Sequence, residues 1–216
     1  MKTTRIKISV LSLAIVAIAS VTGCTNSNNQ NVSTPSVDSV NHTDHGNMAM
    51  ALGTADANYD LRFIDAMAMH HQSAVLMARE AQEKSKRSEI KQLAKNIIKE
   101  QNKEIAQMKQ WRQAWYPQAS DQPVAYGGAN KSVVPMSAEQ HATMMMSEDL
   151  GAADAQFDLR FINAMIPHHE GALVMAKDAL NKSKRPEIQQ LAQNILKSQQ
   201  AEIEQMQQWR KAWYNQ

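Results

Sequence analysis

The sequence predicts an all-α protein made of two long helical hairpins in tandem, arranged as a four-helix bundle. The segments 58–116 and 156–214 match each other at an offset of 98 residues, with 36 of 59 positions identical. Within each copy, apolar residues recur at spacings of three and four, which is one face of an α-helix. A lone hairpin would leave these faces uncovered, so two hairpins together are the economical arrangement. Whether they pack on each other or on a second chain stays open.

Each copy divides into two helices joined by a polar turn. The first helix of the first copy carries a stripe formed by Phe63, Met67, His70, Ala74 and Met77. The second helix carries another stripe, from Ile90 to Trp115. The turn 84–87 reads Lys-Ser-Lys-Arg, so the two helices should fold back antiparallel. In the second copy Pro186 stands at the predicted start of the second helix, where proline is tolerated.

The chain begins with a segment typical of export. The apolar stretch 8–19 is too short to span a bilayer permanently, and it follows three basic residues, Lys2, Arg5 and Lys7. Cys24, the only cysteine, comes after Val-Thr-Gly and resembles the lipobox of bacterial lipoproteins, whose cysteine is lipidated. We therefore expect a signal peptide over 1–24 and membrane attachment through the N-terminal lipid only. An ordinary signal peptide is the alternative. Thr25 in place of Asp favours the outer membrane, facing the periplasm.

Composition limits the remaining choices. A single lipidated cysteine excludes disulfides and a cysteine zinc site. Without the three basic residues of the leader, 20 Lys and Arg stand against 21 Asp and Glu, and this balance does not indicate nucleic-acid binding. The polar segment 25–53 is predicted to be a disordered tether. The predicted hairpins are 54–116 and 154–216, joined by a connector over 117–153.

Adjacent histidines stand in the first helix of each copy, as His70-His71 and His168-His169. Folding the first hairpin about its turn sets His70 level with Glu104, and Met67 near Met108. The second copy repeats this set with His168, Glu202, Met165 and Met206. Because neighbouring residues on a helix point about 100° apart, one imidazole of each pair can face inward while the other faces the rim or a neighbour.

These side chains favour a soft metal ion. Thioether sulfur and imidazole suit Cu(I) and, by the same logic, Ag(I). The chain has 14 methionines against three phenylalanines, whereas a core built for packing alone more often uses Leu and Phe. Further candidate ligands lie outside the obvious core. They are His42, His45, Met48 and Met50 before the first hairpin, and His141, Met144, Met145 and Met146 before the second.

Two alternatives stay open. Methionine is a common gap-filler in cores, so the chain can also be a structural or partner-binding helical lipoprotein without metal. A di-iron-type oxidase is the enzymatic alternative, but such centres use a Glu-x-x-His motif, which is absent from the sequence. The carboxylates available to it are few: Asp60, Glu104, Asp158 and Glu202. No recognisable nucleophile motif occurs either, so we do not expect an enzyme.

Pro167 distinguishes the two copies, because it replaces Met69 directly before the histidines. A proline inside a helix frees the carbonyl four residues back, here that of Asn163, and tends to kink the chain. It also removes a thioether, so the two sites need not be equivalent.

The pattern Asp-x-x-Phe-Ile-x-x-Met-x-x-His-His-x-x-Ala-x-x-Met-Ala occurs at 60–78 and 158–176, and Gln-x-x-Glu-Ile-x-x-Met occurs at 101–108 and 199–206. Both resemble the signature of a bacterial family known as domain of unknown function 305. The resemblance implies a ferritin-like bundle, secretion and, for some members, periplasmic copper binding and resistance. It implies as ligands Met67, His70, His71, Met77 and Met108, with their counterparts Met165, His168, His169, Met175 and Met206.

Together these observations predict a cell-envelope lipoprotein that binds Cu(I) or Ag(I) through Met and His, for sequestration, resistance or transfer. Glu104 and Glu202 are secondary ligand candidates. No organic cofactor is expected. A homo-oligomer or a metallochaperone partner stays open.

Overall fold

The computed structural model describes residues 52–216. The predictions for the leader, Cys24, and the His42, His45, Met48 and Met50 run lie outside the described residues. The helices are α2 (Tyr59–Lys84), α3 (Ser88–Trp115), α4 (Ala138–Met145), α5 (Phe157–Lys182) and α6 (Pro186–Tyr214). Two short strands, β1 (Val124–Ala125) and β2 (Val134–Pro135), pair antiparallel within the connector.

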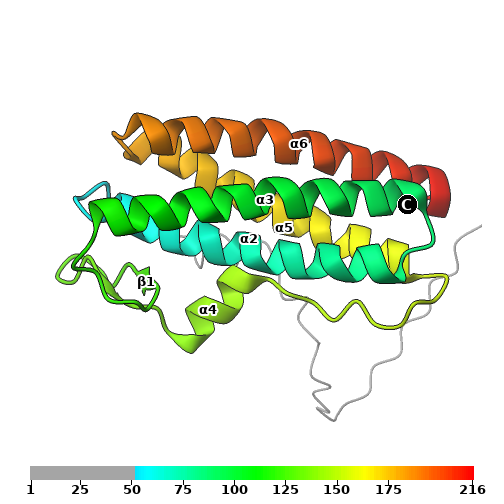
Figure 1. The fold of residues 1–216 in the computed structure, drawn as a ribbon, viewed down its shortest axis with the longest axis horizontal. Helices are drawn as coiled ribbons and strands as arrows, with labels where there is room; N and C mark the ends of the chain where they lie inside the picture. Colours follow the sequence, from blue (N-terminus) through cyan, green and yellow to red (C-terminus); the bar gives the residue numbers. More distant parts are fainter. Residues whose placement is uncertain (1–51) are drawn as a thin grey trace, which may run out of the picture. The chain divides into compact units, whose positions relative to one another are not determined.

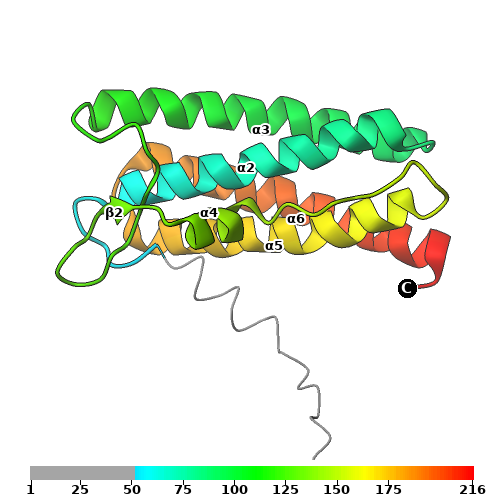
Figure 2. The ribbon, with the colours of Figure 1, turned by 90° about the horizontal axis from the view of Figure 1, so that it is seen from below.

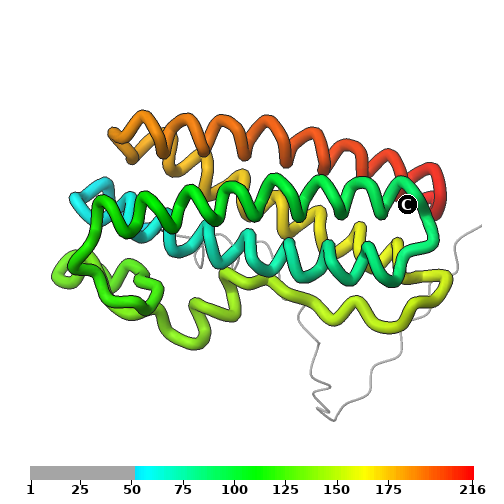
Figure 3. The backbone as a smooth tube through the Cα atoms, viewed as in Figure 1, coloured from blue at the N-terminus to red at the C-terminus, as the bar shows by residue number. Residues whose placement is uncertain are grey.

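Two antiparallel hairpins, α2–α3 and α5–α6, pack on each other to form the bundle (Figure 1). The first helices, α2 and α5, are in direct contact. The turns of the two hairpins lie at opposite ends of the bundle (Figure 3). The prediction of an all-α four-helix bundle is confirmed, and the hairpins cover each other's apolar faces within one chain. None of the helices described is long and apolar enough to cross a membrane.

Methionines from both hairpins share the core. One cluster of buried residues contains Met67, Met108 and Met175. The other contains Met77, Met165 and Met206. Each cluster therefore combines thioethers of both hairpins, so the candidate sulfur ligands are not grouped hairpin by hairpin.

The turn of each hairpin is fastened to the opposite hairpin by an arginine. The Arg87 guanidinium lies 4.1 Å from the centre of the Trp213 ring and 3.6 Å from the Asp158 carboxylate. The second hairpin repeats this arrangement, at 4.2 and 3.3 Å, with Arg185, Trp115 and Asp60. A cation over an aromatic face is attracted by the ring quadrupole. These contacts set the register between the two hairpins at both ends of the bundle.

The connector is anchored to the first hairpin through Asp65 of α2. Its carboxylate accepts two hydrogen bonds from Arg112, at 2.6 and 3.1 Å, and one from the backbone N–H of Val124 at 3.0 Å. The corresponding position in α5 is Asn163, whose amide oxygen accepts a 3.3 Å bond from Arg210. The second hairpin thus lacks the carboxylate that fixes the connector to the first.

The second half of the connector forms a helix that the sequence interpretation did not predict. Ser137 and Gln140 make a reciprocal capping box at its start. Helix α4 packs on α2, on the side of the bundle that faces the viewer in Figure 2. Met144 is only 4% exposed, and its neighbours pack against the first core cluster: Met136, Met145 and Met146. The expectation that Met144 to Met146 lie outside the core is therefore wrong for Met144, which is buried, while Met145 and Met146 are half-buried against the same cluster. His141 is exposed, as expected.

The two prolines of the second hairpin occupy different positions. Pro186 stands at the first turn of α6, as predicted. Pro167 lies inside α5, which nevertheless runs as one helix from Phe157 to Lys182.

Candidate metal centre

The two histidine pairs meet in the middle of the bundle. The rings of His70 from α2 and His168 from α5 have centroids 3.8 Å apart, with planes inclined at 41°. The four histidine side chains are fully buried or nearly so. The first histidine of each pair therefore faces the opposite hairpin. At this contact, one imidazole of the first hairpin packs against one imidazole of the second.

The second histidine of each pair faces a glutamate on its own hairpin. Nε2 of His71 lies 2.8 Å from Oε2 of Glu104, and His169 makes the same contact with Glu202. Folding the hairpin in sequence set these carboxylates level with the correct turn of helix but assigned them to the first histidine. The rotation of about 100° between neighbours explains the difference.

These carboxylates determine where the imidazole protons lie. A carboxylate only accepts hydrogen bonds, so Nε2 of His71 carries a proton, and Nδ1 is the ring nitrogen left without a partner among the described residues. The same holds for His169. A carboxylate that receives the other ring N–H is the usual outer partner of a metal-bound histidine. Glu104 and Glu202 are therefore better placed to orient imidazoles than to bind an ion directly.

Ser73 fixes the proton of one central imidazole. Its hydroxyl donates to the carbonyl of His70 at 2.8 Å and lies 2.7 Å from Nε2 of His168. Because the hydroxyl proton is used, the oxygen accepts from Nε2–H, and Nδ1 of His168 keeps its lone pair. The counterpart of Ser73 in α5 is Gly171, which has no hydroxyl. Neither ring nitrogen of His70 has a hydrogen-bond partner within the described chain.

Burial keeps the central imidazoles neutral. Removal from water is the main cause that lowers the pKa of His70 and His168 well below the usual 6.5, and repulsion from neighbouring imidazoles adds to it. A neutral ring is the form that binds a metal ion.

Buried polar atoms without a hydrogen-bond partner are concentrated in the layer of the bundle that contains the four histidines, called the histidine layer below. Across residues 52–216, ten buried side-chain nitrogen and oxygen atoms lack a hydrogen-bond partner, and seven of them belong to the four histidines, Gln101 and Gln199. A buried polar atom without a partner costs about 1–3 kcal/mol, so such a group calls for an explanation. Binding of a ligand would explain why several of these atoms lack a partner.

Thioethers flank the histidines along the bundle axis. Met67 precedes His70 by about one helical turn, and Met77 follows it by two. The equivalent positions of α5 hold Met165 and Met175, and the second helices contribute Met108 and Met206. All six are buried, in the two core clusters described above. The structure thus buries all six methionines carried over from the family pattern in the core of the bundle.

Carboxylates do not join this layer as free ligands. Residues 52–216 contain no group of three or more His, Cys, Asp or Glu side chains placed to hold a metal ion. Asp60 is bound to Arg185 at the end of the bundle, ten residues or about 15 Å along α2 from His70. Asp158 is bound to Arg87 in the same way. The four carboxylates considered for a di-iron centre therefore do not converge.

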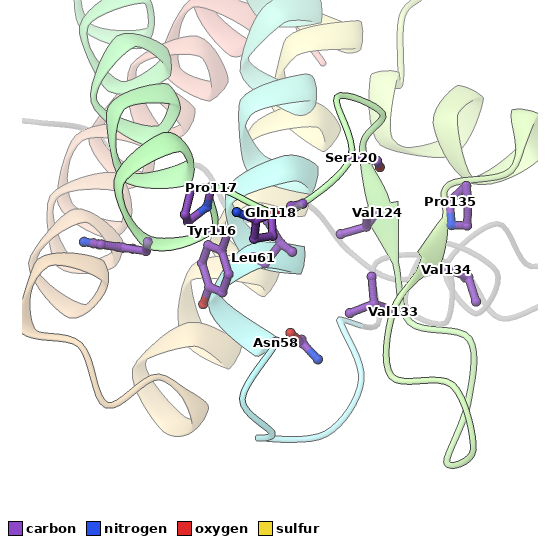
Figure 4. A pocket seen from close by; sticks show the side chains of 12 residues that line it. Asn58, Leu61, Tyr116, Pro117, Gln118, Ser120, Val124, Val133, Val134 and Pro135 are labelled. Carbon is purple, nitrogen blue, oxygen red and sulfur yellow. The ribbon is translucent and has the colours of Figure 1, made fainter.

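A separate, mainly apolar cavity of about 540 Å³ lies at one end of the bundle (Figure 4). It is lined by the start of α2, the end of α3 and the connector, with side chains that include Leu61, Trp115, Tyr116, Val124 and Val134. Among the residues that the structure describes, no histidine or methionine lines it. The cavity is therefore distinct from the histidine layer.

Comparison with known proteins agrees with this arrangement. The family model described as Domain of unknown function (DUF305) matches residues 60–210. The chain belongs to the DUF305 family. A solved DUF305 fragment from Deinococcus radiodurans is 30% identical, with a TM-score of 0.56, and the match covers 72% of this chain and 96% of that one.

This DUF305 chain is also similar to CopM, solved in a Cu(I)-bound form. The two are 38% identical with a TM-score of 0.55, over 72% of this chain and 97% of CopM. CopM has also been solved in Ag-bound and Cu(II)-bound forms. A curated relative, Uncharacterized protein L153 of Acanthamoeba polyphaga mimivirus, is 49% identical over 49 residues. That match spans only 32% of the relative and 23% of this chain.

Three buried polar residues, Ser73, Gln101 and Gln199, were not identified as site candidates from the sequence. Ser73 was missed because a serine in a helix carries no signal of its own, although its replacement by Gly171 is a difference close to the histidine pair that both copies share. Gln101 and Gln199 were quoted only as part of a pattern. Their repetition three residues before each glutamate places them on the same helical face, which was a usable signal.

Proposed function

We propose that this protein is a non-enzymatic, lipid-anchored protein of the bacterial cell envelope that binds Cu(I) or Ag(I) through histidine and methionine. The observation that carries the proposal is the contact between His70 and His168. Within residues 52–216, three ring nitrogens at this contact have no hydrogen-bond partner: Nδ1 and Nε2 of His70, and Nδ1 of His168. One imidazole from each hairpin would bind the same ion.

The chemistry of the surroundings supports a soft monovalent ion. Neutral imidazole and thioether suit Cu(I) and Ag(I), whereas Mg²⁺, Ca²⁺ and Mn²⁺ prefer oxygen ligands. The nearby carboxylates of Glu104 and Glu202 already accept hydrogen bonds from histidines. Similarity to CopM, which has been solved with copper and with silver, supports the same choice.

The cellular role rests on the sequence of the leader. Cys24 in its lipobox-like setting supports attachment to the outer membrane, facing the periplasm. A buried site with neutral ligands suits sequestration, resistance, or transfer to a metallochaperone.

A Cu(I) competition titration against a chromophoric chelator tests the proposal. The tag-free full chain is compared with H70L/H168L, which removes both central imidazoles, and with a variant lacking the ligands of 42–50 and 136–146. L76A/V174A is the matched control, because these exposed side chains occupy equivalent positions on α2 and α5. We expect H70L/H168L to lose at least tenfold in affinity while the control does not. Absence of Cu(I) and Ag(I) binding by the folded parent would overturn the proposal.

A further inference from the structure

A second cavity, of about 330 Å³, opens beside the first hairpin between α2, α3 and the connector. A thioether and an imidazole line it, those of Met69 and His141. Met69 is 4% exposed, whereas His141 is exposed and makes no side-chain hydrogen bond to a described residue. The cavity thus combines one soft sulfur and one uncommitted imidazole within reach of solvent.

The charges around this cavity are balanced. Its charged lining residues are Asp65, Lys109, Arg112 and Asp121. Asp65 and Arg112 are paired with each other at 2.6 Å. With two positive and two negative groups, the lining does not exclude a monovalent cation.

The second hairpin does not reproduce these ligands. Pro167 takes the place of Met69, and Asn163 takes the place of Asp65, which anchors the connector. His141 itself belongs to the connector, which has no counterpart in the copied segments. The pairing of thioether and imidazole therefore belongs to the first hairpin.

Helix α4 leads from this cavity toward the central histidines. Met144 and Met145 follow His141 by three and four residues, so they lie one turn further along the same side of the helix. Met144 is buried in the core cluster that also contains Met67 and Met69. On α2, Met69 directly precedes His70.

We propose that Met69 and His141 form a solvent-facing acquisition site for Cu(I) or Ag(I), from which the ion passes along the α4 methionines to His70 and His168. This inference rests on the proposed function, because it assigns the access side of the central site. Two neutral ligands next to solvent bind such an ion more weakly than the buried centre, so the ion can move inward.

Silver titration of the tag-free full chain, labelled with ¹³C at the methionine methyl groups, tests this site. M69L assigns the Met69 signal. Because the buried centre binds Ag(I) more tightly, we expect the Met67 and Met108 signals to respond at the first additions. The Met69 methyl resonance and the His141 ring signals should shift together as the centre approaches saturation. In H141A the Met69 shift should need about tenfold more Ag(I), while the Met67 and Met108 signals still respond at saturation. E139A, an exposed change on the same helix, is the matched control and should behave as the parent.

The outcomes separate this inference from the proposed function. A response of the central methyl groups without any response of Met69, or a Met69 shift that is unchanged in H141A, would overturn the acquisition site alone. If no methionine or histidine signal responds to Ag(I), both the acquisition site and the proposed function are wrong.

Discussion

His70 and His168 belong to different hairpins, yet their imidazole rings lie 3.8 Å apart at the centre of the bundle. The contact makes the central site a product of hairpin packing, because neither hairpin can form it alone. Duplication of the sequence therefore gives one shared centre flanked by two His–Glu pairs, at His71 and at His169.

Ser73 should position His168. In S73A, Nε2–H of His168 loses its buried acceptor, so we expect the metal-free protein to lose about 1–3 kcal/mol of unfolding free energy. Ag(I) affinity should also fall by roughly 10–100-fold, the usual effect of removing an outer partner of a ligand. Urea unfolding and competition titration measure the two effects. S198A, an exposed serine-to-alanine change on α6, is the control. Equal results for the two variants would contradict the role of Ser73.

Acid should destabilise the metal-free protein through its central histidines. The pKa of both is lowered in the folded state, so the unfolded chain binds more protons once the pH falls below about 6.5. Stability should be full above that value and decline below it, by up to about 2.7 kcal/mol per pH unit for two groups. Urea unfolding between pH 5 and 8 checks this, and H70L/H168L should flatten the slope. H141A, which changes an exposed histidine, should keep the same dependence of stability on pH. If the stability of the parent protein is constant over this range, the explanation is refuted.

Asp65 should hold the connector in place. D65N installs the residue found at the equivalent position of the second hairpin and weakens the bonds to Arg112 and to the Val124 N–H. We expect faster hydrogen exchange and proteolysis over residues 120–136, with the four long helices still protected. N163A is the control on α5. Unchanged protection of the connector in D65N would show that other contacts hold it.

Arg87 and Arg185 should stabilise the packing of the two hairpins. Each combines an aromatic contact with an ion pair to the opposite hairpin. Changing both to Lys keeps the charge but removes the planar group that stacks on tryptophan. We expect the free energy of unfolding to fall by about 1–2 kcal/mol. Tryptophan fluorescence recorded during unfolding measures this loss. K86R/K184R, at neighbouring turn positions, should have little effect, and equal stability of both variants would contradict this.

Much of the fold could be predicted because its signals are local. The helical stripes and the polar turn of Lys84 to Arg87 define each hairpin, and antiparallel folding brought the correct turn of helix level with Glu104. The partner of each imidazole could not be predicted. It depends on how α2 is rotated against α5, and that rotation is set by contacts between residues about 100 positions apart in the sequence. Ser73 and His168 form such a pair.

The connector was the other region whose fold was predicted only in part from the sequence. Prolines and glycines correctly indicated a break after α3, but the fold of α4 depends on a tertiary surface that the sequence does not display. Its capping box at Ser137 and Gln140 was a local signal that could have been used. The burial of Met144 follows from the docking of α4 on α2.

The most direct test of a shared central site is a titration of the full chain with Ag(I), followed by ¹⁵N signals of the histidine rings. The account predicts that ring nitrogens of His70 and His168 shift together and saturate at one Ag(I) per chain. Shifts of the two histidines at different amounts of Ag(I), or a shift of only one of them, would contradict a single ion shared between the hairpins.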